Sequence, residues 1–215
     1  MDIKLSHKAW MLGFIVEAVI KNKIVGELQM WGEQLCLLAQ VVHAAGDGDH
    51  LDIGTLSGGS AIFAALVKKF MGLRGMVYTI DPLDMVFFLQ NRLYFTGGDW
   101  QGKPVPTAEQ VLENFKMFDV EDRIVFEQVG TIDWPFPEDW RPVSALIDGA
   151  HSFDDVLLDW TKCSALCDFI VFHDYSEYSW EGVKQVVDGY ALQDPRFEKL
   201  SQADACIAFV RKKDE

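Results

Sequence analysis

The chain has 215 residues, of which 49% are hydrophobic, and its formal net charge is −14, from 19 basic and 33 acidic residues. This length and composition fit one α/β domain with a sizeable hydrophobic core. The acidic balance argues against a nucleic-acid partner, because such proteins usually carry a basic face, and it favours action on a small molecule.

The amino-terminal region, residues 1–46, is predicted to be a helical extension that precedes a core domain over residues 47–215. Two helices are expected over residues 5–45, with breaks near Gly26 and Gly32. No linker or low-complexity tract divides the chain, so we predict a single domain. The amino-terminal helices are one of two candidate surfaces for a homo-oligomer.

Neither a membrane segment nor a secretion signal is expected. The apolar run Trp10–Ile20 contains Glu17, is too short to span a bilayer and lacks a cleavage site. The four cysteines have no Cys-x-x-Cys spacing and are interpreted as buried thiols: Cys36, Cys163, Cys167 and Cys206. Reduced thiols are typical of a reducing compartment, so we predict a cytoplasmic protein with no membrane partner.

The first strand and the loop behind it predict a cofactor site. A strand is expected over His50–Gly54, and the next helix over Ser57–Phe70, with small residues between them. Glycine allows a ligand to approach the backbone, and a helix amino terminus offers N–H groups to an anion. The residues expected to contact the cofactor are Asp52, Gly54, Thr55, Ser57, Gly58, Gly59 and Ser60.

The spacing of this loop selects among cofactors. A dinucleotide site reads Gly-x-Gly-x-x-Gly, whereas this loop reads Asp-x-Gly-x-x-x-Gly-Gly. Asp52 would repel a pyrophosphate but suits an ammonium group, and Asp81, ending a predicted strand over Met76–Asp81, is placed to hold ribose hydroxyls. An amine, a carboxylate and a ribose describe S-adenosylmethionine, and not NAD. Gly130, Thr131 and Asp133 are expected to flank its adenine.

Strands and helices alternate through the rest of the chain. The expected elements are helix Thr107–Phe118, strands Arg123–Gln128 and Val143–Asp148, helix Ser152–Cys167, strand Asp168–His173, helix Trp180–Leu192, and a hairpin of Phe197–Leu200 with Ala205–Arg211. They predict a Rossmann-like, doubly wound, mainly parallel seven-stranded sheet with a carboxyl-terminal antiparallel hairpin. The aromatic-rich connection 82–106 is predicted to be a lid, a substrate wall or a second oligomer surface.

Two predicted strand ends carry acids and imidazoles. One reads Ile147-Asp148-Gly149-Ala150-His151, and the other reads Phe172-His173-Asp174-Tyr175. In a doubly wound sheet these strands are neighbours, so their ends should meet. Carboxylates with imidazole suit a divalent cation such as Mg²⁺, Mn²⁺ or Fe²⁺, and imidazole also suits a general base. The alternatives are purely structural roles: Asp148 would cap the following turn, and His173 would be a buried, hydrogen-bonded side chain.

With these residues in view, the chain resembles class I S-adenosylmethionine-dependent methyltransferases. More narrowly, it resembles the metal-dependent O-methyltransferases of the macrocin and cephalosporin-pathway type. The matching segments are Leu51–Ala61, Tyr78–Pro82, Ile147–Asp159 and Phe172–Tyr175.

The resemblance implies roles for the second group of residues. Asp148 would bind the metal and lie beside the cofactor, His151 would be the base, and Asp174 would be a second metal ligand. His173 stands where the family has an acid, and it is predicted as a further ligand and as the competing base. The family's Gly-Gly turn before the fifth strand is absent from this sequence.

The predicted function is methylation of a small-molecule hydroxyl, on a sugar or another natural product, with S-adenosylmethionine and a divalent metal. The Asn/Asp-Pro-Pro-aromatic motif of amine methyltransferases is absent. Two alternatives stay open: an iron-dependent hydroxylase or lyase on the same cofactor fold, and a catalytically silent binding module.

Overall fold

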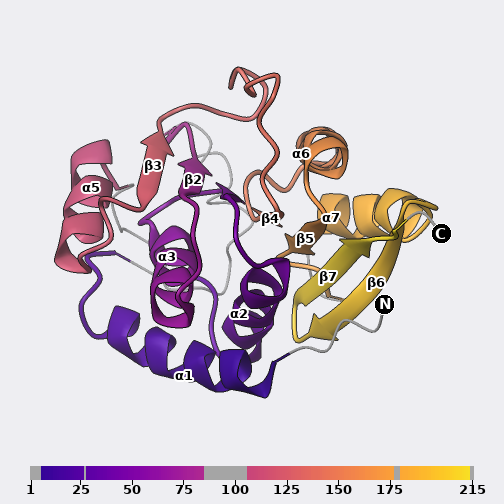
Figure 1. Cartoon of the computed structure of the whole chain (residues 1–215). Coiled ribbons are helices and arrows are strands. Elements are labelled where there is room, and N and C mark those ends of the chain that lie inside the picture. The colour runs from indigo at the N-terminus through magenta and orange to yellow at the C-terminus, as the bar shows by residue number, and fades with distance from the viewer. Residues whose placement is uncertain (1–5, 27, 85–105, 177–179, 214–215) are drawn as a thin grey trace.

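The computed structural model describes residues 6–26, 28–84, 106–176 and 180–213. Within these residues seven strands form one sheet in the order β3-β2-β1-β4-β5-β7-β6 (Figure 1). The strands are β1 (His50–Ile53), β2 (Val77–Ile80), β3 (Ile124–Glu127), β4 (Ser144–Ile147), β5 (Phe169–Phe172), β6 (Phe197–Ala203) and β7 (Cys206–Arg211). The Rossmann-like sheet predicted from the sequence is thereby confirmed.

Strand direction follows the prediction as well. Strands β1 to β5 pair in parallel, whereas β7 is antiparallel to both β5 and β6. The central strand β1 lies between β2 and β4, with Ile53 opposite Ile80 and Ile147. Ile147 in turn lies opposite Phe172 of β5. The carboxyl ends of four parallel strands therefore meet along one edge of the sheet, where open α/β sheets bind ligands.

The helices lie where the hydrophobic periodicity predicts them. They are α1 (His7–Lys21), α2 (Glu33–Ala45), α3 (Gly59–Met71), α5 (Ala108–Met117), α6 (Phe153–Leu166) and α7 (Glu181–Val186), which continues as the π-helical turn Val187–Ala191. Side chains cap three of them at the amino terminus: Ser6 for α1, Thr107 with Gln110 in a capping box for α5, and Ser152 for α6. Such caps satisfy N–H groups that the helix itself leaves unpaired.

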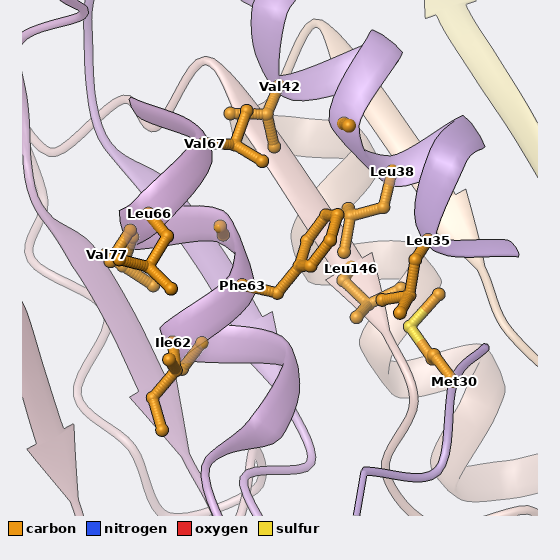
Figure 2. Packing of buried hydrophobic residues seen from close by; sticks show 14 of the residues in the cluster. Met30, Leu35, Leu38, Val42, Ile62, Phe63, Leu66, Val67, Val77 and Leu146 are labelled. Carbon is orange, nitrogen blue, oxygen red and sulfur yellow. The ribbon is translucent and has the colours of Figure 1, made fainter. Parts of the chain in front are cut away.

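Helices cover both faces of the sheet. Helices α1, α2, α3 and α5 lie on one face, while α6 and α7 lie on the other (Figure 1). Because strand side chains alternate, Leu146 faces the first layer and its neighbours Ala145 and Ile147 face the second. Figure 2 shows Phe63 of α3 directed toward Leu38 of α2 above the sheet. The four cysteines are buried thiols, as predicted.

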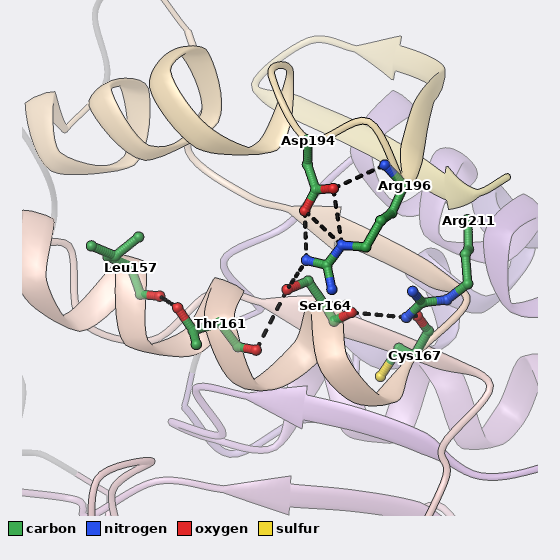
Figure 3. A network of polar contacts seen from close by, with 7 residues as sticks. All are labelled: Leu157, Thr161, Ser164, Cys167, Asp194, Arg196 and Arg211. Atoms are coloured by element: carbon green, nitrogen blue, oxygen red, sulfur yellow. Dashed lines mark hydrogen bonds and ion pairs between the residues drawn. The ribbon is translucent and has the colours of Figure 1, made fainter.

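The missing Gly-Gly turn before β5 has a substitute. The guanidinium of Arg211, from β7, donates to the carbonyl oxygens of Ser164 and Cys167, each at 2.8 Å, at the carboxyl end of α6 (Figure 3). Arg196 reaches the same end and donates to Ser164 Oγ at 3.3 Å. Cations at this position satisfy the last carbonyls of a helix and complement its dipole. The hairpin therefore closes α6 in place of a glycine cap.

Two further predictions concern the connection 82–106 and membrane-spanning segments. Most of the aromatic-rich connection 82–106, including its proposed lid, lies outside the described residues. No helix among the residues that the structure describes is long and apolar enough to cross a membrane.

Candidate functional site

Acidic side chains gather at the carboxyl edge of the parallel strands. Asp52 lies in β1, and Asp81, Asp148 and Asp174 follow β2, β4 and β5. Burial raises the pKa of Asp52 and of Asp81, and the nearby Asp148 carboxylate adds to both effects. This edge thus holds a concentration of negative charge that a cationic ligand would relieve.

Asp52 is a buried carboxylate with one unused oxygen. Its Oδ2 accepts hydrogen bonds from Ser60 Oγ at 3.1 Å and Thr79 Oγ1 at 2.7 Å. Its Oδ1 is buried and accepts no hydrogen bond from the described residues. Burial outweighs the two donors and raises the pKa of Asp52 to about 7. An orphaned buried oxygen of this kind fits an ammonium group, which would supply both charge and N–H donors.

The loop after Asp52 requires glycine for steric reasons. At Gly54, φ is +105°, and a Cβ would lie 2.0 Å from the carbonyl oxygen of Asp148. At Gly58, φ is +84°, and a Cβ would lie 2.6 Å from the ring of Phe115. Helix α3 then begins at Gly59 with no side-chain cap. No side chain of the cap residue Gly58 satisfies the first-turn N–H groups, so a ligand carboxylate could accept from them.

Asp81 braces this loop from β2. Its Oδ2 accepts the backbone N–H of Leu56 at 2.8 Å, and its Oδ1 accepts that of Leu83 at 2.8 Å. Leu56 has a positive φ of 46°, so the hydrogen bond stabilises a strained loop residue. The backbone of Thr55 is a third donor to this carboxylate, which leaves one of its four lone pairs for a ligand. The structure therefore places Asp81 beside the glycine loop, in a position compatible with ribose hydroxyls.

Three of the predicted cofactor contacts have other partners. The hydroxyl of Thr55 pairs with that of Thr79 at 2.6 Å, and Ser60 donates to Asp52, so both are buried supports of the carboxylate. The side chain of Ser57 lies against the amino-terminal segment, where a Cβ on Gly26 would be 2.2 Å from Ser57 Oγ. We therefore do not assign these three hydroxyls to the cofactor.

Asn114 is a residue that the sequence analysis missed in this region. Its side chain exchanges two hydrogen bonds with the backbone of Val25, at 3.0 and 2.8 Å, and donates to the carbonyl of Ser57 at 2.9 Å. Helix α5 thereby fixes both the segment before α2 and the glycine loop. An asparagine on an amphipathic helix gives no signal of this in sequence.

The predicted adenine side lies at the turn after β3. Asp133 donates its N–H to the Gly130 carbonyl at 3.1 Å, and its side chain is exposed. Thr131 hydrogen-bonds the carboxyl of Asp159, a nearly buried residue of α6 whose pKa burial raises to about 7. Asp159, another residue that the sequence analysis did not assign, therefore ties this turn to α6.

A second group of donors lies beside the glycine loop. One ligand atom from each of Asp148, His151 and Asp174 can be chosen so that all three lie within 4.8 Å of one another. His151 Nε2 is 2.9 Å from Asp174 Oδ2, yet it has no hydrogen bond of good geometry among the described residues. Two carboxylates and one imidazole that converge in this way suit a divalent cation.

His173 is near this group but is directed away from it. Its Nδ1 lies 2.9 Å from Asp148 Oδ1, and its Nε2 lies 3.1 Å from Gln34 Oε1. Gln34 Oε1 also accepts the Trp31 N–H at 3.2 Å, and Gln34 Nε2 donates to Asp204 Oδ2 at 2.7 Å. These contacts fix the orientation of the amide, so the oxygen of Gln34 faces His173 and the imidazole Nε2 must carry a proton.

Both ring nitrogens of His173 therefore act as donors to acceptor oxygens. Burial alone would lower the pKa of His173, but the carboxylates of Asp148 and Asp174 hold it well above its usual value. Asp174 responds in the opposite sense: burial would raise its pKa, but contacts with His151 and His173 lower it. The prediction that His173 is a metal ligand, and its candidacy as the base, do not agree with this arrangement, because no lone pair remains.

The fold is the one found in solved O-methyltransferases, as the resemblance predicted. The O-methyltransferase NovP superposes with a TM-score of 0.68 at 15% identity, covering 95% of this chain and 98% of NovP. TomG from Streptomyces achromogenes, an O-methyltransferase involved in tomaymycin synthesis and solved with SAM, gives 0.56 at 16% identity, covering 98% and 92%.

The same fold also serves a different acceptor. An rRNA methylase from Streptococcus thermophilus superposes with a TM-score of 0.51 at 12% identity, covering 87% of this chain and all (100%) of the methylase. No family model and no curated protein sequence matches the chain. These comparisons establish the fold, and the choice of chemistry depends on the side chains of this chain.

Proposed function

We propose that this protein is an S-adenosylmethionine-dependent methyltransferase that methylates a hydroxyl group of a small molecule, with help from a divalent cation. One observation carries the proposal. The unused, buried Oδ1 of Asp52 lies under a glycine loop that packs directly against Asp148, one of three convergent metal-type ligands. A site for an ammonium-bearing cofactor and a site for a hydroxyl-activating cation are therefore adjacent.

The cofactor would be held by its polar ends. Asp52 Oδ1 would accept the ammonium group, the first-turn N–H groups of α3 would bind the carboxylate, and Asp81 would accept the ribose hydroxyls. When bound, S-adenosylmethionine would supply a methyl group on its sulfonium sulfur; transfer forms the bond from the acceptor oxygen to the methyl carbon and breaks the S–CH3 bond, so that the cofactor leaves as a neutral thioether. The contribution of the protein is then to orient the acceptor in line with the methyl group and to remove its proton.

The cation would be held by Asp148 and Asp174. The chemistry supplied there would be that of a Lewis acid, which would make the acceptor hydroxyl more acidic. We assign His151, three residues beyond Asp148, as the group that takes the hydroxyl proton, and Asp174, 2.9 Å from its Nε2, would stabilise the imidazolium that forms. His173 would act behind this group, since it fixes Asp148 through its Nδ1.

Electrostatics support a small-molecule acceptor over a nucleic acid. The chain carries 33 acidic and 19 basic residues, and four acids line the edge of the site. A phosphate backbone would be repelled by such a surface. The absence of the Asn/Asp-Pro-Pro-aromatic motif also supports a hydroxyl acceptor over an amine.

The decisive experiment follows a labelled methyl group. The protein is incubated with methyl-labelled S-adenosylmethionine, Mg²⁺ or Mn²⁺, and fractionated small-molecule extracts, and the labelled product is identified by mass spectrometry. We expect transfer to an oxygen, and we expect His151→Gln to lower kcat about 10²–10⁴-fold. His43→Gln, near the carboxyl end of α2, is the matched control and should keep full activity. Failure of the wild-type protein to bind the cofactor would overturn the proposal.

A further inference from the structure

The start of α7 lies in direct contact with the backbone that carries His151. A Cβ on Gly182 would lie 2.4 Å from the carbonyl oxygen of His151 and 2.6 Å from the backbone nitrogen of Phe153. Both of these atoms belong to rigid backbone, so a side chain at residue 182 would have to push α7 away from the turn. Only glycine allows the helix to approach this closely, although glycine is a poor helix former.

The residue before α7 covers the ring of His151. The indole of Trp180 and the imidazole of His151 are stacked, with centroids 4.7 Å apart and planes 9° from parallel. The side chain of His151 is 19% exposed, and its Nε2 is buried beside Asp174. Trp180 and Gly182 thus hold the side chain and the backbone of the same residue.

We propose that Trp180 and Gly182 are positioning residues that set the imidazole plane of His151 for proton transfer. The terminal torsion of a histidine is broad and weakly restrained by its own bonds. Stacking removes that freedom, and in the stacked orientation Nε2 points to within 2.9 Å of Asp174 Oδ2. Loss of the stack lets the ring rotate away from the ligand group.

This inference rests on the proposed role of His151 as the base, but it adds residues that touch neither cofactor nor metal. The effect should therefore be on turnover and not on cofactor affinity. A displacement of about 1 Å in a reacting group can cost about a hundredfold in rate. We expect Trp180→Leu to lower kcat by about ten- to a hundredfold and to leave the Kd for S-adenosylmethionine within about twofold.

Trp180 also packs against the hydrophobic core of α6 and α7, so a purely structural role must be separated from positioning. Trp180→Phe keeps a flat ring beside the imidazole and should restore kcat to within about threefold of wild type. Gly182→Ala should reproduce the loss of Trp180→Leu. Gly189→Ala is the matched control, because a Cβ there meets nothing within 4 Å. Both alanine substitutions favour helix, so helix propensity cannot account for a difference.

A second readout does not depend on methyl transfer. Diethyl pyrocarbonate modifies accessible histidines, and mass spectrometry gives the rate for each one, with His7 as an exposed internal reference. We expect the rate at His151 to rise about fivefold or more in Trp180→Leu and Gly182→Ala, and to be unchanged in Trp180→Phe and Gly189→Ala. If these two variants change the reactivity of His151 but the wild-type protein transfers no methyl group, the positioning is supported and the proposed function is refuted. Unchanged reactivity and kcat, with only a lower melting temperature, would overturn the positioning role.

Discussion

Asp52 should make cofactor binding depend on pH near neutrality. Its pKa in the free protein is about 7 because the carboxyl is buried. Binding an ammonium group requires the ionised carboxylate, so the free protein must first lose a proton from Asp52. About nine-tenths of the molecules are ionised at pH 8 and about one-tenth at pH 6. The Kd for S-adenosylmethionine should therefore be about tenfold weaker at pH 6 than at pH 8.

Calorimetry tests this directly. Titrations in two buffers of different ionisation enthalpy should show release of about one proton at pH 6 and about 0.1 proton at pH 8. Asp52→Asn presents an N–H donor where the ammonium needs an acceptor, so it should weaken binding by about 1.5–3 kcal/mol. The variant keeps any pH dependence that comes from the cofactor itself. An equal pH dependence in both proteins would refute the role of Asp52.

The same residue predicts the stability of the unliganded protein. The folded pKa of Asp52 is raised from 3.8 to about 7, so its contribution is present below pH 3.8 and is lost as pH rises through 7. At pH 8 the free energy of unfolding is therefore lower by at most about 4 kcal/mol than it would be with the ordinary pKa of an Asp carboxyl. Urea denaturation should show that Asp52→Asn gains stability relative to wild type as pH rises from 4 to 8. A constant difference between the two proteins would contradict the raised pKa.

Three further predictions concern stability and are measured by urea denaturation. Gly54→Ala should cost at least about 3 kcal/mol, because its Cβ would meet a backbone oxygen at a φ of +105°, whereas Gly72→Ala, with φ +70° and open space, should cost about 1–2 kcal/mol. Burial lowers the pKa of His50 to about 3, so its stabilising contribution is present above pH 6.5 and is lost toward pH 3 at about 1.4 kcal/mol per unit. His50→Gln should therefore flatten stability between pH 6 and 4, and an unchanged slope would contradict this account. Arg211→Met should cost about 1–3 kcal/mol by uncapping α6, whereas equal stability in Arg211→Met and Lys212→Met would show that the cap contributes nothing.

Elements close in sequence were predictable from local patterns. The parallel strands, the glycine loop and the capped helix after Ser152 follow from hydrophobic periodicity, from φ > 0 positions and from capping residues. The meeting of Asp148 with Asp174 also followed, because adjacent parallel strands end at the same edge. These inferences needed only the backbone path.

Contacts between polar side chains distant in sequence were not predictable. His173 and Gln34 are 139 positions apart, and nothing in either local sequence indicates that an amide would occupy the second ring nitrogen. A histidine beside an acid is equally consistent with a metal ligand, a base or a buried cation. The choice depends on which side chains the packed helices bring to it, and periodicity describes only which face of a helix is apolar.

The bond network around His173 also orders the events of synthesis. Gln34 leaves the ribosome early because it lies in α2, and His173 follows much later because it comes after β5. Asp204, in the turn between β6 and β7, is the last residue of this network to emerge. The nascent chain can pair β1, β2 and β4 before that turn emerges, but the amide of Gln34 then lacks the carboxylate that orients it. Both partners of the imidazole, Asp148 and Gln34, precede it in the chain, but the Gln34 amide is oriented by Asp204 only when the antiparallel hairpin docks. A chain that ends before the hairpin would therefore hold the glycine loop while Gln34 is still free to turn its amide away from His173.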